Sequence, residues 1–349
     1  MGYFRENIEK MAGYEPGFQP KSVDVVKLNT NENPYSPSPK VLEAIKNITP
    51  EQLRRYPQPQ ADTFRDAAAE IFDIKSENII CTNGGDELLN MAIRAFCDEN
   101  RPVAYPTPTY SLYPVLAQMQ NCPAVEIPFD DEFNLPSKLA AAGAALTIVC
   151  NPNAPSGTFI PKQELAQLAE EIKGVLLIDE AYVDFARDSC LELVKNFKNV
   201  IILRSMSKGY SLAGMRFGFG IADKDLIDGL MKVKDSYNVD AIAIAAATAA
   251  IKDQKYFKQN IEKIKCERKK LSDELTRLGF GVLKSESNFV LAKYTAIRAI
   301  DIYEKLKEKN IYVRYWAYPQ IKDKLRITVG TAEQNDKLIG ALKEILAQG

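Results

Sequence analysis

The chain has 349 residues, and its 45 Lys and Arg against 46 Asp and Glu give a formal net charge of −1. This balance offers no basic excess to a phosphodiester backbone and argues against a nucleic-acid partner. No apolar stretch approaches the roughly 20 residues of a membrane-spanning helix, and the N-terminus has no apolar signal core. We therefore expect a cytoplasmic protein of about two domains, without a membrane partner.

The sequence contains no histidine, which excludes Ser-His-Asp and Cys-His catalysis as well as His-ligated zinc. Its six cysteines are widely spaced and form no Cys-x-x-Cys pair, so we expect neither a metal site nor a redox dithiol. Acid–base chemistry must then use Lys, Tyr or carboxylates, and we expect a cofactor to carry the difficult step.

Residues 1–40 are rich in Pro, Asn and Tyr and predict an irregular arm. Between residues 41 and 250, short apolar runs alternate with helical stretches, which is the pattern of a mainly parallel sheet covered by helices on both faces. The runs are Asn78–Thr82, Val103–Tyr105, Val125–Pro128, Leu146–Cys150, Val175–Asp179, Val200–Leu203 and Phe217–Ile221. We therefore predict a large α/β domain at residues 41–250 with a mainly parallel seven-stranded sheet.

The pattern changes after residue 250. A long charged helix is predicted at about Tyr256–Leu278, and short strands and helices follow it. The last helix opens with Thr331-x-x-Gln334, the spacing of a capping box. We predict a smaller α+β domain at residues 251–349, which the arm of residues 1–40 joins.

A polar loop with Ser205, Ser207, Lys208 and Arg216 follows the sixth predicted strand. Two hydroxyls and a guanidinium around a lysine suit a phosphate dianion beside an amine, because Arg binds phosphate bidentately and hydroxyls donate without adding charge. The positive surroundings also favour the neutral amine, which is the nucleophilic form. A solvated turn with one exposed lysine would have the same local spacing.

Asp179 ends an apolar strand, at the carboxyl edge where α/β sheets bind their ligands. A carboxylate there needs a cation or hydrogen-bond donors, although an Asp at a strand end commonly caps the next turn instead. Tyr182, three residues later, can place a phenol over the same edge.

Gly84, Gly85 and Asp86 stand between a predicted strand and a helix, where backbone N–H groups and the helix dipole can hold an anion. Tyr110 and the loop of residues 151–157 follow two other strands at the same edge. They offer an aromatic ring for stacking and amides for a ring hydroxyl.

Taken in chain order, these segments resemble the pyridoxal-phosphate site of the fold-type I, class I/II aminotransferases, and the resemblance covers essentially the whole chain. It implies that Lys208 binds pyridoxal 5'-phosphate covalently, that Asp179 pairs with the pyridinium nitrogen and that Tyr182 bonds the ring hydroxyl. The further cofactor contacts that it implies are Gly85, Asp86, Tyr110, Ser205, Ser207 and Arg216.

Within that family the chain resembles the histidinol-phosphate aminotransferases. The segments that carry this resemblance are Tyr14, the Asn-Glu-Asn-Pro-Tyr-Ser-Pro-Ser-Pro run at 31–39, Arg55-Tyr56-Pro57, Ile311–Arg314 and Leu325–Gly330. It implies transamination between histidinol phosphate and 2-oxoglutarate, a step of histidine biosynthesis in which glutamate is the amino donor of the reverse reaction. The substrate-binding residues that it implies are Tyr14, Asn33, Arg314 and Arg326. It also implies a homodimer in which Tyr56 reaches the cofactor phosphate of the other subunit.

One position departs from the family pattern. Many relatives read Asn-Pro-Asn-Asn-Pro-Thr-Gly, whereas Ala154 stands here in place of the Asn before the second proline. We expect Asn153 to supply the amide for the ring hydroxyl instead, with Tyr182 sharing that contact.

Other activities use related sites. A broad aromatic amino-acid aminotransferase needs only Arg326 and a roomy pocket, and a threonine-phosphate decarboxylase would use the same cofactor and also bind a substrate phosphate. A ligand-sensing regulator of the same fold would need a DNA-binding segment, and the arm is too short and too weakly basic to provide one.

Overall fold

The computed structural model describes residues 2–20 and 24–348. Its largest element is a seven-stranded sheet with the strand order β2-β8-β7-β6-β5-β3-β4. Neighbouring strands from β4 to β7 run parallel, whereas β8 runs antiparallel to both β7 and β2. In chain order the strands are β2 (Ile79–Thr82), β3 (Val103–Thr107), β4 (Ala124–Pro128), β5 (Leu146–Cys150), β6 (Val175–Asp179), β7 (Val200–Ser205) and β8 (Gly218–Ala222). The predicted α/β class with a mainly parallel seven-stranded sheet is confirmed.

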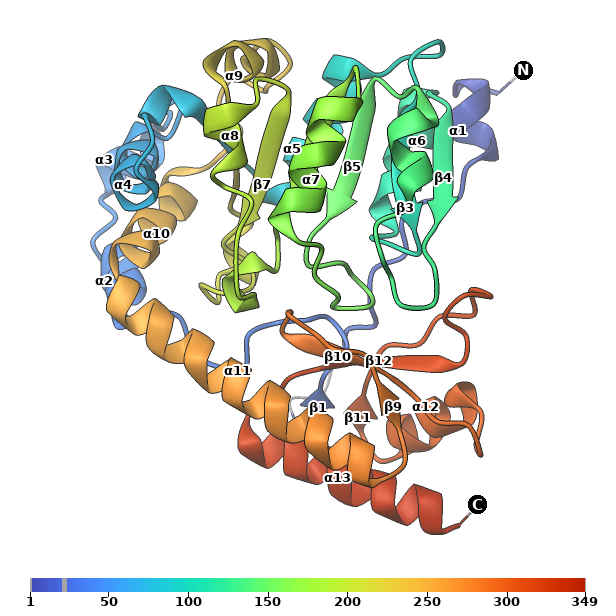
Figure 1. Ribbon diagram of the computed structural model, residues 1–349. Helices are drawn as coiled ribbons and strands as arrows, with labels where there is room; N and C mark the ends of the chain where they lie inside the picture. The colour runs from blue at the N-terminus through green and yellow to red at the C-terminus, as the bar shows by residue number, and fades with distance from the viewer. Residues whose placement is uncertain (1, 21–23, 349) are drawn as a thin grey trace.

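The central strands send alternate side chains to opposite faces of the sheet, as the two-residue period of a strand requires. In β7, Val200 and Ile202 join one buried cluster, whereas Ile201 and Leu203 join the cluster on the other face. Helices cover both faces (Figure 1), so these strands are mostly apolar, and polar residues such as Asp179 and Ser205 stand at their carboxyl ends. The first face carries α2 (Pro39–Lys46), α4 (Asp62–Phe72), α7 (Lys162–Glu171), α8 (Leu193–Asn196) and α10 (Ala241–Lys252), and the second carries α5 (Gly84–Phe96), α6 (Leu112–Gln120) and α9 (Lys224–Met231).

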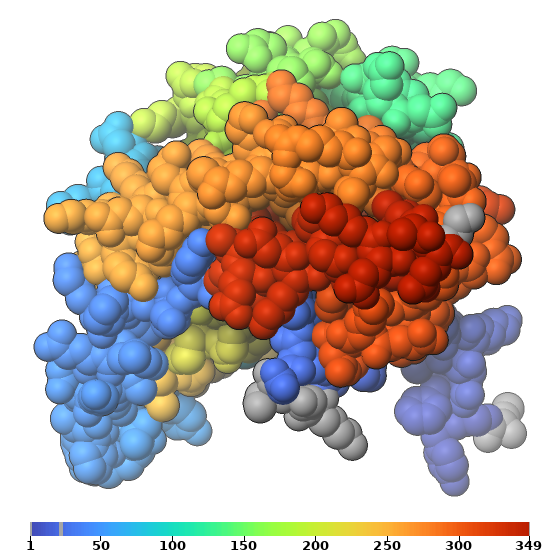
Figure 2. Space-filling model, turned by 90° about the horizontal axis from the view of Figure 1, so that it is seen from below, coloured from blue at the N-terminus to red at the C-terminus, as the bar shows by residue number. Residues whose placement is uncertain are grey.

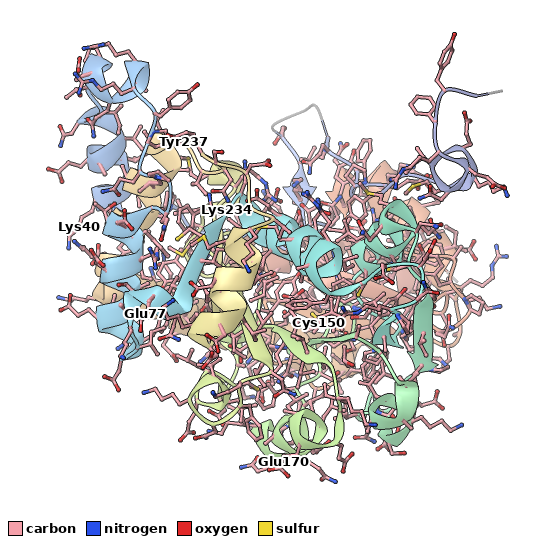
Figure 3. All side chains as sticks on the ribbon, turned by 90° about the horizontal axis from the view of Figure 1, so that it is seen from above. Lys40, Glu77, Cys150, Glu170, Lys234 and Tyr237 are labelled. Atoms are coloured by element: carbon pink, nitrogen blue, oxygen red, sulfur yellow. The ribbon has the colours of Figure 1, made fainter. Side chains whose placement is uncertain are left out.

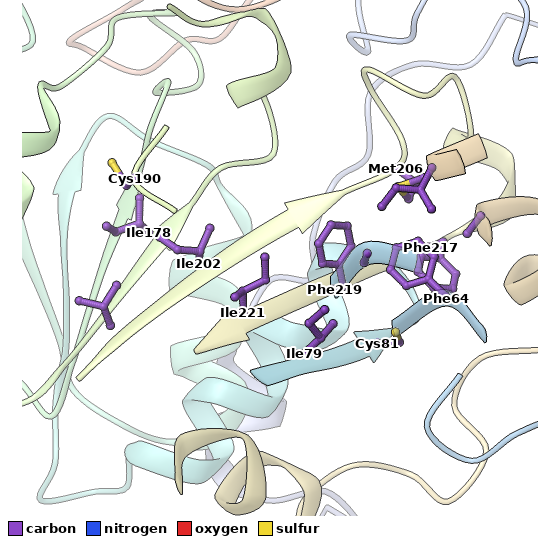
Figure 4. Packing of buried hydrophobic residues seen from close by; sticks show 14 of the residues in the cluster. Phe64, Ile79, Cys81, Ile178, Cys190, Ile202, Met206, Phe217, Phe219 and Ile221 are labelled. Atoms are coloured by element: carbon purple, nitrogen blue, oxygen red, sulfur yellow. The ribbon is translucent and has the colours of Figure 1, made fainter. Parts of the chain in front are cut away.

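Aromatic packing closes the antiparallel edge of this sheet. The ring of Phe64 from α4 lies 4.4 Å from that of Phe217 and 5.2 Å from that of Phe219, centroid to centroid (Figure 4). The same cluster continues through Ile202 and Ile178 on β7 and β6. Because close-packed interiors tolerate little displacement, this layer holds the ends of β6 and β7 in fixed positions.

A second, antiparallel sheet has the order β12-β10-β9. Helices α11 and α13 lie side by side beneath it (Figures 1 and 2), and Leu28 from the N-terminal segment joins its buried cluster. The elements are β9 (Gly281–Val282), β10 (Phe289–Lys293), β12 (Lys324–Thr328), α11 (Gln254–Arg277), α12 (Ala299–Glu308) and α13 (Ala332–Ala347). The division of the chain at residues 40 and 250 stays a prediction.

The N-terminal segment contacts both sheets. Helix α1 (Glu6–Lys10) lies against α6, where the Asn7 side chain donates to the Gln118 carbonyl at 2.7 Å. Strand β1 (Val26–Lys27) pairs in parallel with β11 (Ile311–Tyr312), and α3 (Pro50–Arg54) follows α2. Within residues 2–20 and 24–348, every helix is too short or too polar to span a bilayer.

Candidate active site

A cavity of about 520 Å³ opens at the carboxyl ends of β5, β6 and β7, between the two sheets and the N-terminal segment. All but three of the residues singled out from the sequence line it. These lining residues are Tyr14, Gly85, Asp86, Tyr110, Asp179, Tyr182, Ser205, Ser207, Lys208, Arg216, Arg314 and Arg326. The structure therefore brings together side chains that lie more than 300 residues apart in the chain.

Lys208 follows β7 and points its amine into this cavity. The amine donates one long hydrogen bond, 3.3 Å, to the carbonyl of Thr30. The pKa of Lys208 is lowered to about 8, mainly by burial and then by the charges of Arg326 and Arg216, while Glu32 and Asp86 oppose the shift. At pH 7 roughly a tenth of the amine is therefore unprotonated and nucleophilic, far more than for an ordinary lysine.

Asp179 ends β6 and is almost fully buried. Its Oδ1 accepts the N–H of Ala181 at 3.1 Å, and its Oδ2 accepts the hydroxyl of Tyr113 at 2.7 Å. Burial raises the pKa of Asp179 to about 6, and these two donors oppose that rise. A buried carboxylate held by donors is ready to pair with a positive charge that enters the cavity.

Tyr113 was not predicted from the sequence as a site residue. It lies three residues after Tyr110, at the start of α6, and its ring meets the rings of Tyr110 and Tyr105 edge-on. The spacing i, i+3 places both tyrosines on one side of a helical turn, and this is the signal that could have revealed Tyr113. Its hydroxyl has a hydrogen-bonding role that its burial alone would not indicate.

An anion cradle is formed where β2 meets α5. Gly84 has a positive φ of 79°, and a Cβ added there would come within 2.6 Å of Nη2 of Arg216. Arg216 pairs with Asp86 at 3.1 Å, and Asp86 in turn accepts the hydroxyl of Tyr110 at 3.1 Å. The N–H groups at the start of α5 and the guanidinium of Arg216 thus lie at one end of the cavity, where a phosphate would be stabilised.

Two arginines stand side by side at another part of the cavity. Arg314 and Arg326 exchange backbone hydrogen bonds of 2.9 Å, and both guanidinium groups lie about 5 Å from the ring of Trp316. Nη2 of Arg326 donates to the carbonyl of Asn29, whereas its Nε is buried with no partner among the described residues. Burial lowers the pKa of Arg326 to about 10, and Arg314 adds to this effect. Two adjacent positive charges with an unused donor suit an anion of more than one charge.

Three residues predicted at the site, Asn33, Tyr56 and Asn153, are not among those that line the cavity. Asn33 donates to the carbonyls of Lys208 and Gly209, so it holds the backbone of the lysine loop. Tyr56 is 81% exposed at the surface and stacks on Tyr237.

Asn153 is the third, and its contact with a ring hydroxyl stays a prediction. Its amide nitrogen donates to the carbonyl of Pro108 and to the hydroxyl of Ser156, and its oxygen accepts the hydroxyl of Thr109. Both amide hydrogens are thus used inside the loop. Ala154, the next residue, lines the cavity but has no donor to offer.

The chain belongs to the aminotransferases of class I and II, because the model of that family matches residues 23–342. It is 51% identical over 346 residues to histidinol-phosphate aminotransferase 1 of Trichormus variabilis and covers 99% of each chain. It is 50% identical over 346 residues to histidinol-phosphate aminotransferase 1 of a Nostoc species, covering 99% of this chain and 98% of the other.

A solved structure also places the chain among proteins of this family. The histidinol-phosphate aminotransferase from Sinorhizobium meliloti in complex with pyridoxal-5'-phosphate superposes with a TM-score of 0.91 at 26% identity, over 100% of this chain and 98% of that chain. The family that the sequence motifs predicted is therefore confirmed.

The buried carboxyl of Asp179 predicts a pH dependence of stability. Its pKa is about 6 in the folded chain against an ordinary 3.8, so between these values the folded chain holds a proton that the unfolded chain has lost. Stability of the ligand-free protein therefore falls as the pH rises from about 4 to 6 and stays lower above it. Asp184 shifts in the same direction and adds to the effect in the same window.

We expect Asp179→Asn to remove the contribution of Asp179 and to stabilise the ligand-free protein at pH 7.5 by about 2 kcal/mol. Denaturant unfolding at pH 4.5 and pH 7.5 measures the difference, which should be much smaller at the lower pH. Equal stability of the two proteins at pH 7.5 would contradict the argument.

Proposed function

We propose that this chain is a pyridoxal-phosphate-dependent aminotransferase that transfers an amino group between histidinol phosphate and 2-oxoglutarate, a step of histidine biosynthesis. The observation that carries the proposal is the pair Arg314 and Arg326, which faces the same cavity as Lys208 and Asp179. Histidinol phosphate has a phosphate ester where an amino acid has its carboxylate. Two arginines suit that dianion, whereas an unphosphorylated aromatic amino acid would need only one.

The residues of the cavity fit pyridoxal 5'-phosphate. The amine of Lys208 suits its aldehyde, the carboxylate of Asp179 suits its protonated ring nitrogen, and the phenol of Tyr182 suits its ring hydroxyl. For the phosphate, Arg216 and the start of α5 supply donors, and Gly84 leaves the space that a Cβ would take. The remaining contacts would come from Gly85, Asp86, Tyr110, Ser205 and Ser207.

When bound, the cofactor supplies an electron sink for the negative charge left on the substrate carbon after its proton departs. Lys208 would take this proton from the substrate carbon and pass it to the C4′ carbon of the cofactor, because its amine lies in the cavity with a pKa lowered to about 8 and the chain has no histidine. Asp179 keeps the ring nitrogen protonated, since a buried carboxylate favours a neighbouring positive charge. Tyr182 donates its hydroxyl hydrogen to the ring oxygen.

Arg314 and Arg326 hold the phosphate of histidinol phosphate, and Tyr14, which lines the same cavity, has its ring 6.1 Å from that of Tyr110. In the other half of the cycle the same arginines bind the two carboxylates of glutamate or 2-oxoglutarate. One cationic pair can thus serve both substrates, because each brings two negative charges.

We further propose a homodimer in which Tyr56 reaches the cofactor phosphate of the partner subunit. The support is an apolar surface around α2 and α3, which we call the α2–α3 patch: Leu42, Leu53, Tyr56 and Tyr237 are 45% to 81% exposed. Figure 2 shows the segment with α2 and α3 protruding from the body of the molecule, and Figure 3 labels Tyr237 beside it. Exposed apolar surface of this kind is typical of an interface.

The three-part division of the chain is also proposed, with an arm at 1–40, a cofactor-binding domain at 41–250 and a small domain at 251–349. Separate buried clusters around the two sheets support it. A cytoplasmic location is supported by the six cysteines, which are all free thiols, as is usual in a reducing compartment.

The choice of amino donor tests the function. The holoprotein, without an oxo-acid, is mixed separately with histidinol phosphate, glutamate, phenylalanine and phosphothreonine, and the loss of the cofactor's visible absorbance is followed. We expect histidinol phosphate and glutamate to remove the band rapidly and the other two to act at least about tenfold more slowly, since each tenfold corresponds to only 1.4 kcal/mol of discrimination.

A band removed as fast by phenylalanine would indicate a broad aromatic aminotransferase, and release of carbon dioxide from phosphothreonine a decarboxylase. Lys208→Ala serves as the control. It should lack the absorbance of the attached cofactor and lose at least about 100-fold in turnover, the usual contribution of a positioned base.

The role of Arg314 has its own test. We expect Arg314→Ala to lower kcat/KM for histidinol phosphate about 10- to 100-fold, because hydrogen bonds to charged groups contribute about 1.5–3 kcal/mol. The residual rate with phenylalanine should change less than about threefold. Arg298→Ala, in an exposed arginine that pairs with Asp301, is the matched control. Equal losses for both substrates would remove Arg314 from phosphate recognition.

The dimer is tested by complementation. When Tyr56→Ala and Lys208→Ala subunits are mixed and allowed to exchange, a hybrid dimer contains one site with both an intact Lys208 and, in trans, an intact Tyr56. At limiting cofactor we expect turnover to rise toward about 25% of the wild-type value, because half of the dimers are hybrids and each has one intact site. If Tyr56 acts within its own subunit, or if the protein is monomeric, mixing should restore nothing.

A further inference from the structure

Asn31 lies between the residue proposed to bond the cofactor's ring oxygen and the strand that carries Arg326. Its amide nitrogen donates to the hydroxyl of Tyr182 at 3.0 Å, and its amide oxygen accepts the hydroxyl of Thr328 at 2.9 Å. Its carbonyl accepts the side chain of Asn288 at 2.9 Å. Asn31 and Thr328 are at most 2% exposed, so this chain of hydrogen bonds is shielded from competing water.

Hydrogen counting fixes the orientation of the Asn31 amide. The backbone N–H of Asn31 can only donate, and it donates to the Thr328 oxygen at 3.0 Å. The single hydroxyl hydrogen of Thr328 is therefore left to donate to the amide oxygen of Asn31. With the amide reversed, Thr328 would accept twice and its hydrogen would have no acceptor among the described residues, which is costly in a buried site.

This orientation also fixes the direction of the Tyr182 hydroxyl. Because the amide of Asn31 presents N–H groups to the phenol oxygen, the phenol accepts from Asn31 and keeps its own hydrogen for another acceptor. We propose that Asn31 is a positioning residue that directs the hydroxyl hydrogen of Tyr182 into the cavity, toward the ring oxygen of the cofactor. The proposal rests on the proposed function, since it needs a cofactor whose ring oxygen lies at Tyr182.

The loop of residues 151–157 explains why the orientation of Tyr182 by Asn31 matters in this chain. Asn153 uses both amide hydrogens within its own loop, and Ala154, which does face the cavity, offers none. Of the residues that the sequence assigned to the ring oxygen, Tyr182 is then the one with a free hydrogen facing the cavity. A phenol rotates freely about its C–O bond, so a second group must decide where its hydrogen points.

The electrostatics keep that hydrogen in place. Burial raises the pKa of Tyr182 to about 12, while Arg326 and the hydrogen bond from Asn31 oppose the rise. Tyr182 therefore stays protonated near neutral pH and can donate. The titratable groups that face it are Arg326 from β12, Asp179 from β6, Cys150 from β5, Lys208 after β7 and Tyr110 before α6.

The test uses Asn31→Asp in the holoprotein. Asn31 has a positive φ of 57°, a conformation that Asp tolerates nearly as well as Asn, so the backbone is preserved. A carboxylate can only accept, which turns the hydroxyl of Tyr182 away from the cavity. The readouts are the pH midpoint of the cofactor's visible absorbance, without substrate, and the dissociation constant of pyridoxal 5'-phosphate.

We expect the midpoint to rise by about one pH unit, because an unsolvated ring oxygen holds its neighbouring proton more tightly. The dissociation constant should rise about fivefold to tenfold, as the loss of one hydrogen bond predicts. A midpoint within about 0.2 units of the wild-type value, in a variant that binds the cofactor, would overturn the proposal.

Thr328→Val provides a variant without a change of charge. It removes the hydroxyl that orients the amide and should also raise the midpoint, whereas Thr328→Ser, which keeps the hydroxyl, should leave the midpoint unchanged. In a Tyr182→Phe background, Thr328→Val should not shift the midpoint further, because the hydroxyl through which Thr328 acts has already been removed. An equal shift in both backgrounds would show that Thr328 acts by another route and would overturn the proposal.

The two proposals fail in different ways. If the variants show the expected midpoint shifts but the wild-type holoprotein does not turn over histidinol phosphate, the role of Asn31 stands and the proposed substrate is wrong. If the wild-type protein turns over histidinol phosphate but the variants leave the midpoint unchanged, the proposed function stands and the proposed role of Asn31 is wrong.

Discussion

The carboxylate of Asp179 is the constraint around which the site is organised. It is buried at the end of a central parallel strand and is stabilised in the ligand-free protein by a hydroxyl and one backbone N–H. Two such donors only partly offset the loss of hydration, so its pKa stays raised. A positively charged ring nitrogen would supply what is missing. The empty site thus lowers the stability of the protein, and binding of the cofactor restores that stability.

The N-terminal segment connects Lys208 and Tyr182 to Arg326. Within five residues, the carbonyl of Asn29 accepts from Arg326, the carbonyl of Thr30 accepts from Lys208, and the side chain of Asn31 bonds Tyr182. Asn33 then holds the backbone at Lys208. Residues from both sheets therefore bond to the same short segment, residues 29–33. A displacement of β12, which carries Arg326, would therefore also displace Lys208 and Tyr182.

The sequence was sufficient for the sheet and for most of the cavity, because both follow from local pattern. Apolar runs predict buried strands, and polar residues just after parallel strands meet at one edge. Tyr113, Trp316 and Asn31 were not predicted as site residues. Tyr113 and Asn31 act through partners far away in the chain, Asp179 and Tyr182, and spacing within one segment does not specify these contacts. Trp316 lies close in the chain to its partners Arg314 and Arg326, but its own segment shows no pattern that marks it as part of the site.

The orientation of the Asn153 amide could not be derived from the sequence for a related reason. The residue type and position were suitable, but the direction of its amide depends on Thr109 and Ser156. Residues with a single chemical option, such as Lys208 or Arg216, can be assigned from pattern, whereas an amide with several possible partners needs the three-dimensional surroundings.

On the proposed assignment, the arginine pair lets one cavity serve two dissimilar substrates. Arg326 is buried with an unused donor beside a second guanidinium, so the empty site contains both repulsion and an unsatisfied hydrogen bond. A ligand with two negative charges relieves both, whether the charges belong to one phosphate or to two carboxylates. A ligand with one charge relieves only part of that cost. Selectivity for doubly charged substrates therefore follows from the state of the empty site as much as from the contacts made in the complex.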